Sequence, residues 1–242
     1  MIYTIATQKG GTGKTTTAAA LAQAAAFKGK KALAIDLDPQ GNLSFNFAAD
    51  ATAPGAYDLL HGAPAADVIQ TTAQGVDVIA ASPNLQTEKT AAGSARRLQE
   101  ALAPIKKKYS IIVIDTPATA GELQYNALQA ADRLLIPLQA DAYNAQSLYQ
   151  IAAAAEQIKN SNPRLKIAGV LLTQFDGRAT ISRHLREVLE ANAKVLKIPF
   201  LGTVRKAIAV QEAAALQRSL FEYAPKSKPA EDYMQIFETI AK

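Results

Sequence analysis

Apolar residues along the chain alternate between short continuous runs and longer stretches with helical spacing. The short runs predict strands at residues 3–7, 32–36, 76–80, 111–115, 134–137 and 167–172, and near Phe200. The longer stretches predict helices at residues 14–27, 94–107, 121–131, 145–159, 181–192, 207–216 and 230–241. This alternation predicts an α/β fold with a mostly parallel central sheet that is covered by helices on both faces.

Composition narrows the class of protein. The 242 residues are 49% hydrophobic and contain no long linker, which predicts a single domain over residues 1–242. The longest apolar runs fall far short of the roughly 18 to 20 residues that a membrane span needs. The first residues lack a secretory signal, so a cytoplasmic location is expected. The chain has no cysteine, which excludes thiolate metal sites and thiolate-held iron–sulfur clusters.

Charge is unevenly distributed along the chain. The formal net charge is +5, and the whole excess lies in residues 151–242, because acidic and basic side chains are equally numerous before them. A local basic excess is typical of a nucleic-acid footprint, but an ordinary solvated basic surface has the same composition. His61 and His184 lie far apart without metal-ligand spacing, and no role is assigned to them.

A glycine-rich segment lies between the first predicted strand and the first predicted helix, in the order Gly10-Gly11-Thr12-Gly13-Lys14-Thr15. In this context backbone N–H groups cradle phosphates, and the N-terminus of the helix adds partial positive charge. Lys14 is predicted to neutralise the β- and γ-phosphates, and Thr15 to offer its hydroxyl to Mg²⁺. A glycine-rich turn that binds nothing is the bland alternative, and the complete Gly, Lys and Thr spacing disfavours it.

Two predicted strands end in acidic residues. Asp115 closes the apolar strand 111–115 and is predicted to hold the metal ion, although an acid at a strand end also caps helices. The second strand runs into Asp36-Leu37-Asp38-Pro39-Gln40-Gly41-Asn42. Proline and glycine suit a sharp loop there. The segment is therefore either a simple turn or a loop that senses the nucleotide, and its residue types allow both.

The segment Gln8-Lys9-Gly10-Gly11-Thr12-Gly13-Lys14-Thr15-Thr16 resembles the deviant Walker A motif of the ParA, Soj and MinD family of P-loop ATPases. The resemblance implies binding of ATP or ADP with Mg²⁺ by the residues from Lys9 to Thr16. It also implies that Lys9 reaches the nucleotide of a partner subunit. Its acidic signature matches the second-strand segment, which implies that Asp38 positions the attacking water and that Asp36 lies near the Mg²⁺ shell. Lys9, Lys14 and Asp38 are thus the expected catalytic residues.

Two later segments resemble the ParA-type members in particular. They are Leu172-Thr173-Gln174-Phe175-Asp176-Gly177-Arg178 and residues 221–233. The resemblance implies an ATPase of plasmid or chromosome partition that is cytoplasmic and associated with the nucleoid. It further implies an ATP-dependent sandwich homodimer that binds DNA nonspecifically, and a ParB-type centromere-binding partner that stimulates hydrolysis. The chain starts at its first predicted strand, so the helix-turn-helix extension of repressor-type relatives is not expected.

The resemblance also suggests base-contacting and DNA-contacting residues. Gln174, Val204 and Arg205 occupy places where the family often contacts adenine, although this chain reads Thr203-Val204-Arg205 where Ile-Pro-Arg is usual. The basic residues predicted to contact DNA phosphates are Arg178, Arg183, Arg186, Arg205, Lys206 and Arg218. Each of them, taken singly, is equally explained as a solvated surface charge.

Two other functions remain open on the same scaffold. A MinD-like membrane ATPase would need a basic amphipathic C-terminal helix, but residues 230–241 carry Glu231, Asp232 and Glu238, with Lys242 as the one cation at that end. No membrane partner is therefore expected. A ligase or kinase that acts on a small molecule would need an additional pocket, and the sequence does not exclude one.

Overall fold

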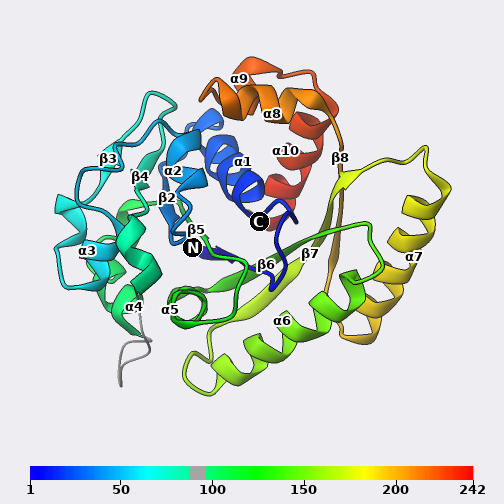
Figure 1. Ribbon diagram of the computed structural model, residues 1–242, viewed down its shortest axis with the longest axis horizontal. Coiled ribbons are helices and arrows are strands. Elements are labelled where there is room, and N and C mark those ends of the chain that lie inside the picture. The colour runs from blue at the N-terminus through cyan, green and yellow to red at the C-terminus, as the bar shows by residue number, and fades with distance from the viewer. Residues whose placement is uncertain (88–95, 242) are drawn as a thin grey trace.

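The computed structural model describes residues 1–87 and 96–241 and places their strands in one eight-stranded sheet (Figure 1). The strand order is β3-β4-β2-β5-β1-β6-β7-β8. The strands are β1 (Ile2–Ile5), β2 (Ala32–Asp36), β3 (Gln70–Thr71), β4 (Asp77–Ile79), β5 (Ile111–Asp115), β6 (Arg133–Gln139), β7 (Lys166–Phe175) and β8 (Phe200–Arg205). Neighbouring strands are parallel except for the short edge pair β3 and β4. The predicted α/β fold is confirmed.

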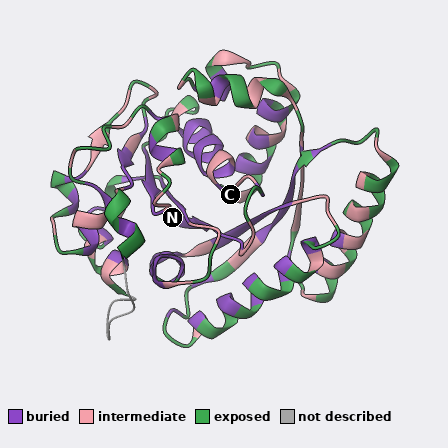
Figure 2. Ribbon diagram, in the orientation of Figure 1, coloured by how far each residue is buried: buried purple, intermediate pink, exposed green. Residues whose placement is uncertain are grey.

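Helices cover both faces of this sheet (Figure 1). One face carries α1 (Lys14–Phe27), α2 (Asn42–Asn46), α8 (Ile208–Ala215), α9 (Leu220–Tyr223) and α10 (Lys228–Ile240). The other carries α3 (Ala56–Leu60), α4 (Arg97–Leu102), α5 (Glu122–Ala130), α6 (Asn144–Lys159) and α7 (Thr180–Val195). Parallel strands need such crossover helices, so the sheet is buried from both sides (Figure 2).

The side chains of β2 show why α1 lies close to the sheet. Ala32 and Ala34 face the core that α1 and α10 share, whereas Leu33 and Ile35 face the core on the opposite side. Successive residues of a strand point to opposite faces, so the alternation of small and large side chains separates the two cores. Alanines on both α1 and β2 allow their backbones to approach closely, which fixes the start of α1 at the edge of the sheet.

The structure departs from the predicted elements mainly at their ends. The helix expected at residues 94–107 is broken, because α4 ends at Leu102 and a short 3₁₀ turn covers Lys106–Lys108. Pro104 lies between them and disfavours helical geometry in the residue before it. Residues 94 and 95 of that prediction lie outside the described residues. The irregular stretch 42–72 contains α2, α3 and β3, which are too short for their periodicity to be read from the sequence.

The C-terminal helix α10 is docked on the core rather than free. Tyr233 and Phe237 are buried in the cluster that includes α1, and the Tyr3 hydroxyl donates a 2.6 Å hydrogen bond to the Ile240 carbonyl. Figure 2 shows the buried side of α10 turned toward α1. Among the described residues, we find no helix with the length and apolarity required to cross a membrane.

Candidate nucleotide-binding site

The glycine-rich loop connects the central strand β1 to α1 at the carboxyl edge of the sheet. Gly11 and Gly13 have φ angles of 74° and 82°, which side-chain-bearing residues rarely adopt. At Gly13 a Cβ atom would also lie 3.3 Å from the Thr173 hydroxyl oxygen, so glycine gives the closest fit to β7. The loop thus ends in the first free N–H groups of α1, as a phosphate site requires.

Lys14 is buried inside this loop. Its ammonium group donates a 3.0 Å hydrogen bond to the Lys9 carbonyl and has 6% exposure for the whole residue. Burial lowers the pKa of Lys14, and the nearby charges of Asp115 and Asp38 partly oppose that shift. A buried cation held by a single carbonyl has capacity for an anionic ligand, and a triphosphate supplies one.

Asp36 and Asp115 face each other at the ends of the paired strands β2 and β5. Both are fully buried. Asp36 accepts hydrogen bonds from the Ser44 backbone N–H at 2.8 Å, the Ser44 hydroxyl at 2.7 Å and the Asp38 N–H at 3.1 Å. Asp36 therefore fixes the loop that leads into α2. Sequence analysis missed Ser44, because nothing in its spacing pairs it with Asp36.

Asp115 has the open coordination position of the pair. Its Oδ1 accepts the Thr116 N–H at 3.1 Å, whereas its buried Oδ2 has no hydrogen-bond partner. Burial raises the pKa of Asp115 well above its usual range, the charge of Asp36 adds to this, and the Thr15 hydroxyl opposes it. An unpartnered buried carboxylate oxygen fits a cation that arrives with the nucleotide.

A resident metal cage is absent from residues 1–87 and 96–241, since no group of three or more acidic, histidine or cysteine side chains with metal-binding geometry occurs there. Magnesium usually needs only one or two protein carboxylates, because phosphates and waters complete its shell. Asp115 and Thr15 fit that incomplete set. Asp36 lies behind them, with its oxygens already bonded to the protein.

In magnesium-free buffer, raising the pH from about 4 to 7 is expected to destabilise the fold. Burial raises the pKa of Asp36 to about 6, whereas an unfolded aspartate titrates near about 3.9. The folded chain therefore binds more protons between these values, so the stability is full below about pH 4 and is lost as the pH rises through about 6. The loss is roughly 3 kcal/mol, for about two pKa units.

Urea unfolding at several pH values measures this effect, with Asp36→Asn as the comparison. The variant keeps an oxygen for the Ser44 donors but cannot ionise, so its stability is expected to fall less over the same range. An equal fall in both proteins would contradict the assignment to Asp36.

Asp38 extends into the same site from the loop after β2. Its Oδ1 accepts the Gln40 N–H at 3.0 Å, and its carbonyl accepts the Gly41 N–H at 2.9 Å. Gly41 has a φ of 67°, which gives the loop its sharp turn. The Asp38 carboxylate is only partly buried and acts electrostatically on Lys14, so it lies at the mouth of the phosphate site.

A pocket of about 260 Å³ opens beside the phosphate loop, between β7, β8 and α8. The predicted base-contacting residues Gln174, Val204 and Arg205 all line it. Sequence analysis missed the apolar part of the lining, which Ile208, Val210 and Tyr233 supply from α8 and α10. An elongated, largely apolar pocket next to a phosphate cradle suits a purine base.

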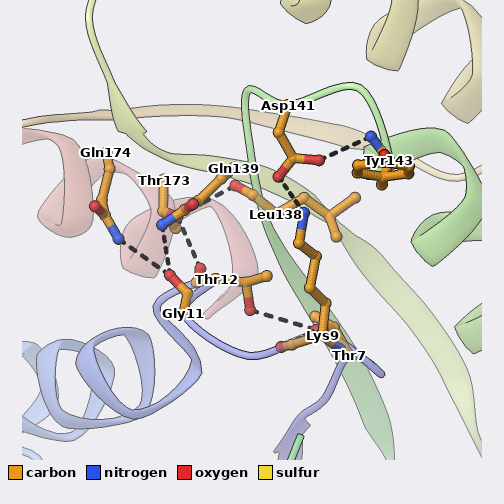
Figure 3. A network of polar contacts seen from close by, with 10 residues as sticks. All are labelled: Thr7, Lys9, Gly11, Thr12, Leu138, Gln139, Asp141, Tyr143, Thr173 and Gln174. Atoms are coloured by element: carbon orange, nitrogen blue, oxygen red, sulfur yellow. Dashed lines mark hydrogen bonds and ion pairs between the residues drawn. The ribbon is translucent and has the colours of Figure 1, made fainter.

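Lys9 points away from the phosphate loop toward the segment after β6 (Figure 3). Its ammonium forms a 2.6 Å ion pair with Asp141 and lies 5.5 Å from the centre of the Tyr143 ring. About 31% of the Lys9 side chain remains exposed, so the pair is open to solvent and to exchange. Asp141 is a second residue that sequence analysis did not single out.

The six basic residues predicted to contact DNA fall into two groups. Arg178, Arg183 and Arg186 lie on α7 and the loop before it, and all three are exposed. Arg205 and Lys206 follow β8, and Arg218 follows α8. The charge of Arg205 is compensated, because its guanidinium pairs with Asp232 at 2.6 Å and Glu231 at 3.4 Å. The geometry thus favours a structural role for Arg205 at the pocket over a contact with DNA.

Known proteins resemble this chain over its whole length. The family model described as an AAA domain matches residues 1–167. The chromosome-partitioning ATPase Soj of Thermus thermophilus is 33% identical, over 98% of this chain and 93% of its own length. The sporulation initiation inhibitor protein Soj of Bacillus subtilis is 34% identical, over 99% and 98%. The chain belongs to the Soj/ParA family of P-loop ATPases. Like its family, this Soj/ParA ATPase is an ATP hydrolase.

A solved structure matches the fold of this Soj/ParA ATPase equally well. Cobyrinic acid a,c-diamide synthase from Mycobacterium smegmatis, with bound ATP analog and magnesium, superposes with a TM-score of 0.83 and 28% identity, over 98% of this chain and 92% of that one. The same scaffold therefore holds members of more than one functional class.

Proposed function

We propose that this Soj/ParA ATPase drives DNA partition by binding Mg·ATP, forming an ATP-dependent homodimer and binding DNA nonspecifically. In this proposal it works at the nucleoid in the cytoplasm, and a ParB-type centromere-binding partner stimulates hydrolysis. The observation that carries the proposal is Lys9, which lies at the mouth of the phosphate site and is held only by a partly exposed ion pair with Asp141. A metabolic enzyme that acts as a monomer has no need for a second cation there.

The proposed roles in hydrolysis follow from the placement of each group. The loop from Gly10 to Thr16 and the buried Lys14 hold the phosphates, and Thr15 with Asp115 holds Mg²⁺, which neutralises charge on the transferred phosphoryl group. Asp38 orients water at the open side of the site. Phosphoryl transfer requires alignment and charge stabilisation more than covalent chemistry, so no further nucleophile is needed.

Lys9 would complete this site in the homodimer. Breaking its ion pair with Asp141 costs little, because exposed pairs contribute about 0 to 1 kcal/mol. Its long side chain is then free to reach a nucleotide in an apposed subunit. A cation delivered at that point stabilises the charge that develops on the phosphates, as an arginine finger does.

The proposed DNA surface is centred on α7. Arg183 and Arg186 are three residues apart and exposed, and Arg178 precedes them with 97% of its side chain exposed. Arg186 is shared with Glu190 through a 2.6 Å ion pair, so DNA phosphate would compete for it. Phosphate contacts of this kind bind DNA without reading its sequence.

Binding to random-sequence duplex DNA in the presence of ATP, ADP or no nucleotide tests this function. ATP alone is expected to switch on binding, and Arg183→Ala/Arg186→Ala is expected to weaken it and to flatten its salt dependence by about 0.9 per lost phosphate contact in the logarithmic slope. Lys106→Ala/Lys107→Ala is the matched control, because this pair lies in the 3₁₀ turn before β5. Absence of DNA binding in every nucleotide state would contradict the partition function while leaving the ATPase in place.

The competing function with structural support is an ATP-dependent enzyme that acts on a small molecule, as the likeness to cobyrinic acid a,c-diamide synthase suggests. A small acceptor that saturates ATP turnover without DNA would favour it. The MinD-like alternative gains no support from α10, whose apolar residues Tyr233 and Phe237 are buried against its own core. Binding to anionic vesicles would revive that alternative.

A further inference from the structure

Three side chains at the ends of β6 and β7 hold the outer side of the phosphate loop (Figure 3). The amide groups of Gln139 and Gln174 both donate to the Gly11 carbonyl, at 2.5 and 3.1 Å. The Thr173 hydroxyl donates to the Thr12 carbonyl at 2.7 Å. Two successive carbonyls of the loop are thus anchored to the sheet edge by groups that belong to neither the loop nor the metal site.

Anchoring these carbonyls sets the direction of the N–H groups. In a trans peptide plane the C=O and N–H bonds point to opposite sides. An outward Gly11 carbonyl therefore turns the Thr12 N–H inward, and an outward Thr12 carbonyl turns the Gly13 N–H inward. Glycines on both sides of Thr12 leave the backbone free to rotate, so without the anchors these peptide planes have alternative orientations.

The local backbone of β7 is built to present two anchors in succession. In a regular strand, Thr173 and Gln174 would point to opposite faces. Here Gln174 has a φ of 52°, and the pairing of β7 with β8 loses register between Leu172 and Phe175. A left-handed glutamine costs roughly 1 kcal/mol or more. Strain of this kind persists where the surrounding contacts enforce it.

β6 supplies the remaining anchor in the same plane. Gln139 is paired in register with Thr173, so the two side chains arise side by side at the carboxyl edge of the sheet. Gln139 also lies outside the lining of the base pocket, whereas Thr173 and Gln174 belong to it. Its contact with Gly11 therefore serves the phosphate loop and not the base.

We propose that Gln139, Thr173 and Gln174 are positioning residues that preorganise the phosphate loop by holding the carbonyls of Gly11 and Thr12 outward. This inference rests on the proposed nucleotide site. Preorganised N–H groups bind a phosphate without first reorienting, and that advantage is absent for any ligand that lacks phosphate.

The shared carbonyl gives the sharpest test. Methionine matches glutamine in size but lacks the donor, so Gln139→Met or Gln174→Met each leaves one amide on Gly11. Each single variant is expected to bind ADP about threefold more weakly, and the double variant about thirtyfold or more, because only the double removes both anchors. Binding of adenosine is expected to stay constant. Gln157→Met, at an exposed position of α6, is the matched control.

Thr173 provides an independent pair of variants. Thr173→Ser keeps the hydroxyl and is expected to keep the affinity for ADP, whereas Thr173→Val loses it several-fold. In turnover assays the Met and Val variants are expected to raise KM for ATP while kcat changes little. Melting temperatures check that each variant is folded.

Two outcomes would overturn the inference. The first is a double variant whose loss of ADP affinity does not exceed the product of the single losses. The second is an equal loss for adenosine, which would assign the effect to the base pocket. A failure of the unaltered protein to bind ADP would instead contradict the nucleotide site itself, so the two failures are distinguishable.

Discussion

Lys14→Ala is expected to reduce ATP turnover by about 10³-fold or more, since it removes the buried cation that faces the β- and γ-phosphates. The ammonium of Lys14 is held in place by the Lys9 carbonyl, and its pKa is lowered by burial, so the site maintains a poorly solvated positive charge in the absence of ligand. Substitution leaves the transferred phosphates without that charge. Steady-state release of inorganic phosphate measures the loss.

The control for Lys14 is a lysine that pairs at the opposite end of the same helix. Lys28 follows α1 and pairs with Glu238 at the surface, at 2.7 Å. Lys28→Ala is expected to leave turnover within about twofold, because exposed pairs contribute little. Substantial turnover by Lys14→Ala would refute the assignment of the phosphate site to this loop.

Asp38→Asn is expected to lower kcat by about 10²- to 10⁴-fold while leaving ATP affinity nearly unchanged. The asparagine oxygen still accepts the Gln40 N–H, so the loop keeps its shape, but the carboxylate that orients water is lost. An ATP-bound state should therefore accumulate. Single-turnover kinetics separate the loss in chemistry from binding.

Asp50 offers a matched control for that experiment. Its carboxylate accepts the Thr52 N–H at 2.8 Å and the Thr52 hydroxyl at 2.6 Å, so it serves a similar turn outside the site. Asp50→Asn should leave kcat as it is. A drop of equal size in both variants would mean that Asp38 shapes the loop rather than the reaction.

The phosphate loop and its metal carboxylate could be predicted from sequence because their chemistry depends on local order. A strand, a glycine turn and a helix follow one another within residues 2–27, and Asp115 ends its own strand. The α/β fold followed from the same short-range signal. Boundaries failed where a local breaker such as Pro104 overrode the periodicity.

The groups that support the site could not be predicted, because their contacts join distant segments. Asp141 meets Lys9 across 132 positions of sequence, and Gln139 meets Gly11 across 128. Glutamine and aspartate at strand ends are common, and nothing in their neighbours names a partner. Ser44 lies nearer to Asp36, but only the turn between them brings its two donors onto one carboxylate oxygen.

The place of β1 in the middle of the sheet has a consequence for synthesis on the ribosome. The phosphate loop is among the first segments made, yet β1 pairs with β5 and β6, and the Tyr233 wall of the base pocket belongs to α10. A nascent chain thus exposes its glycine loop long before it can enclose a nucleotide. ATP can stabilise only a chain already extended through α10, so ligand binding marks finished molecules and leaves partial ones to chaperones and proteases.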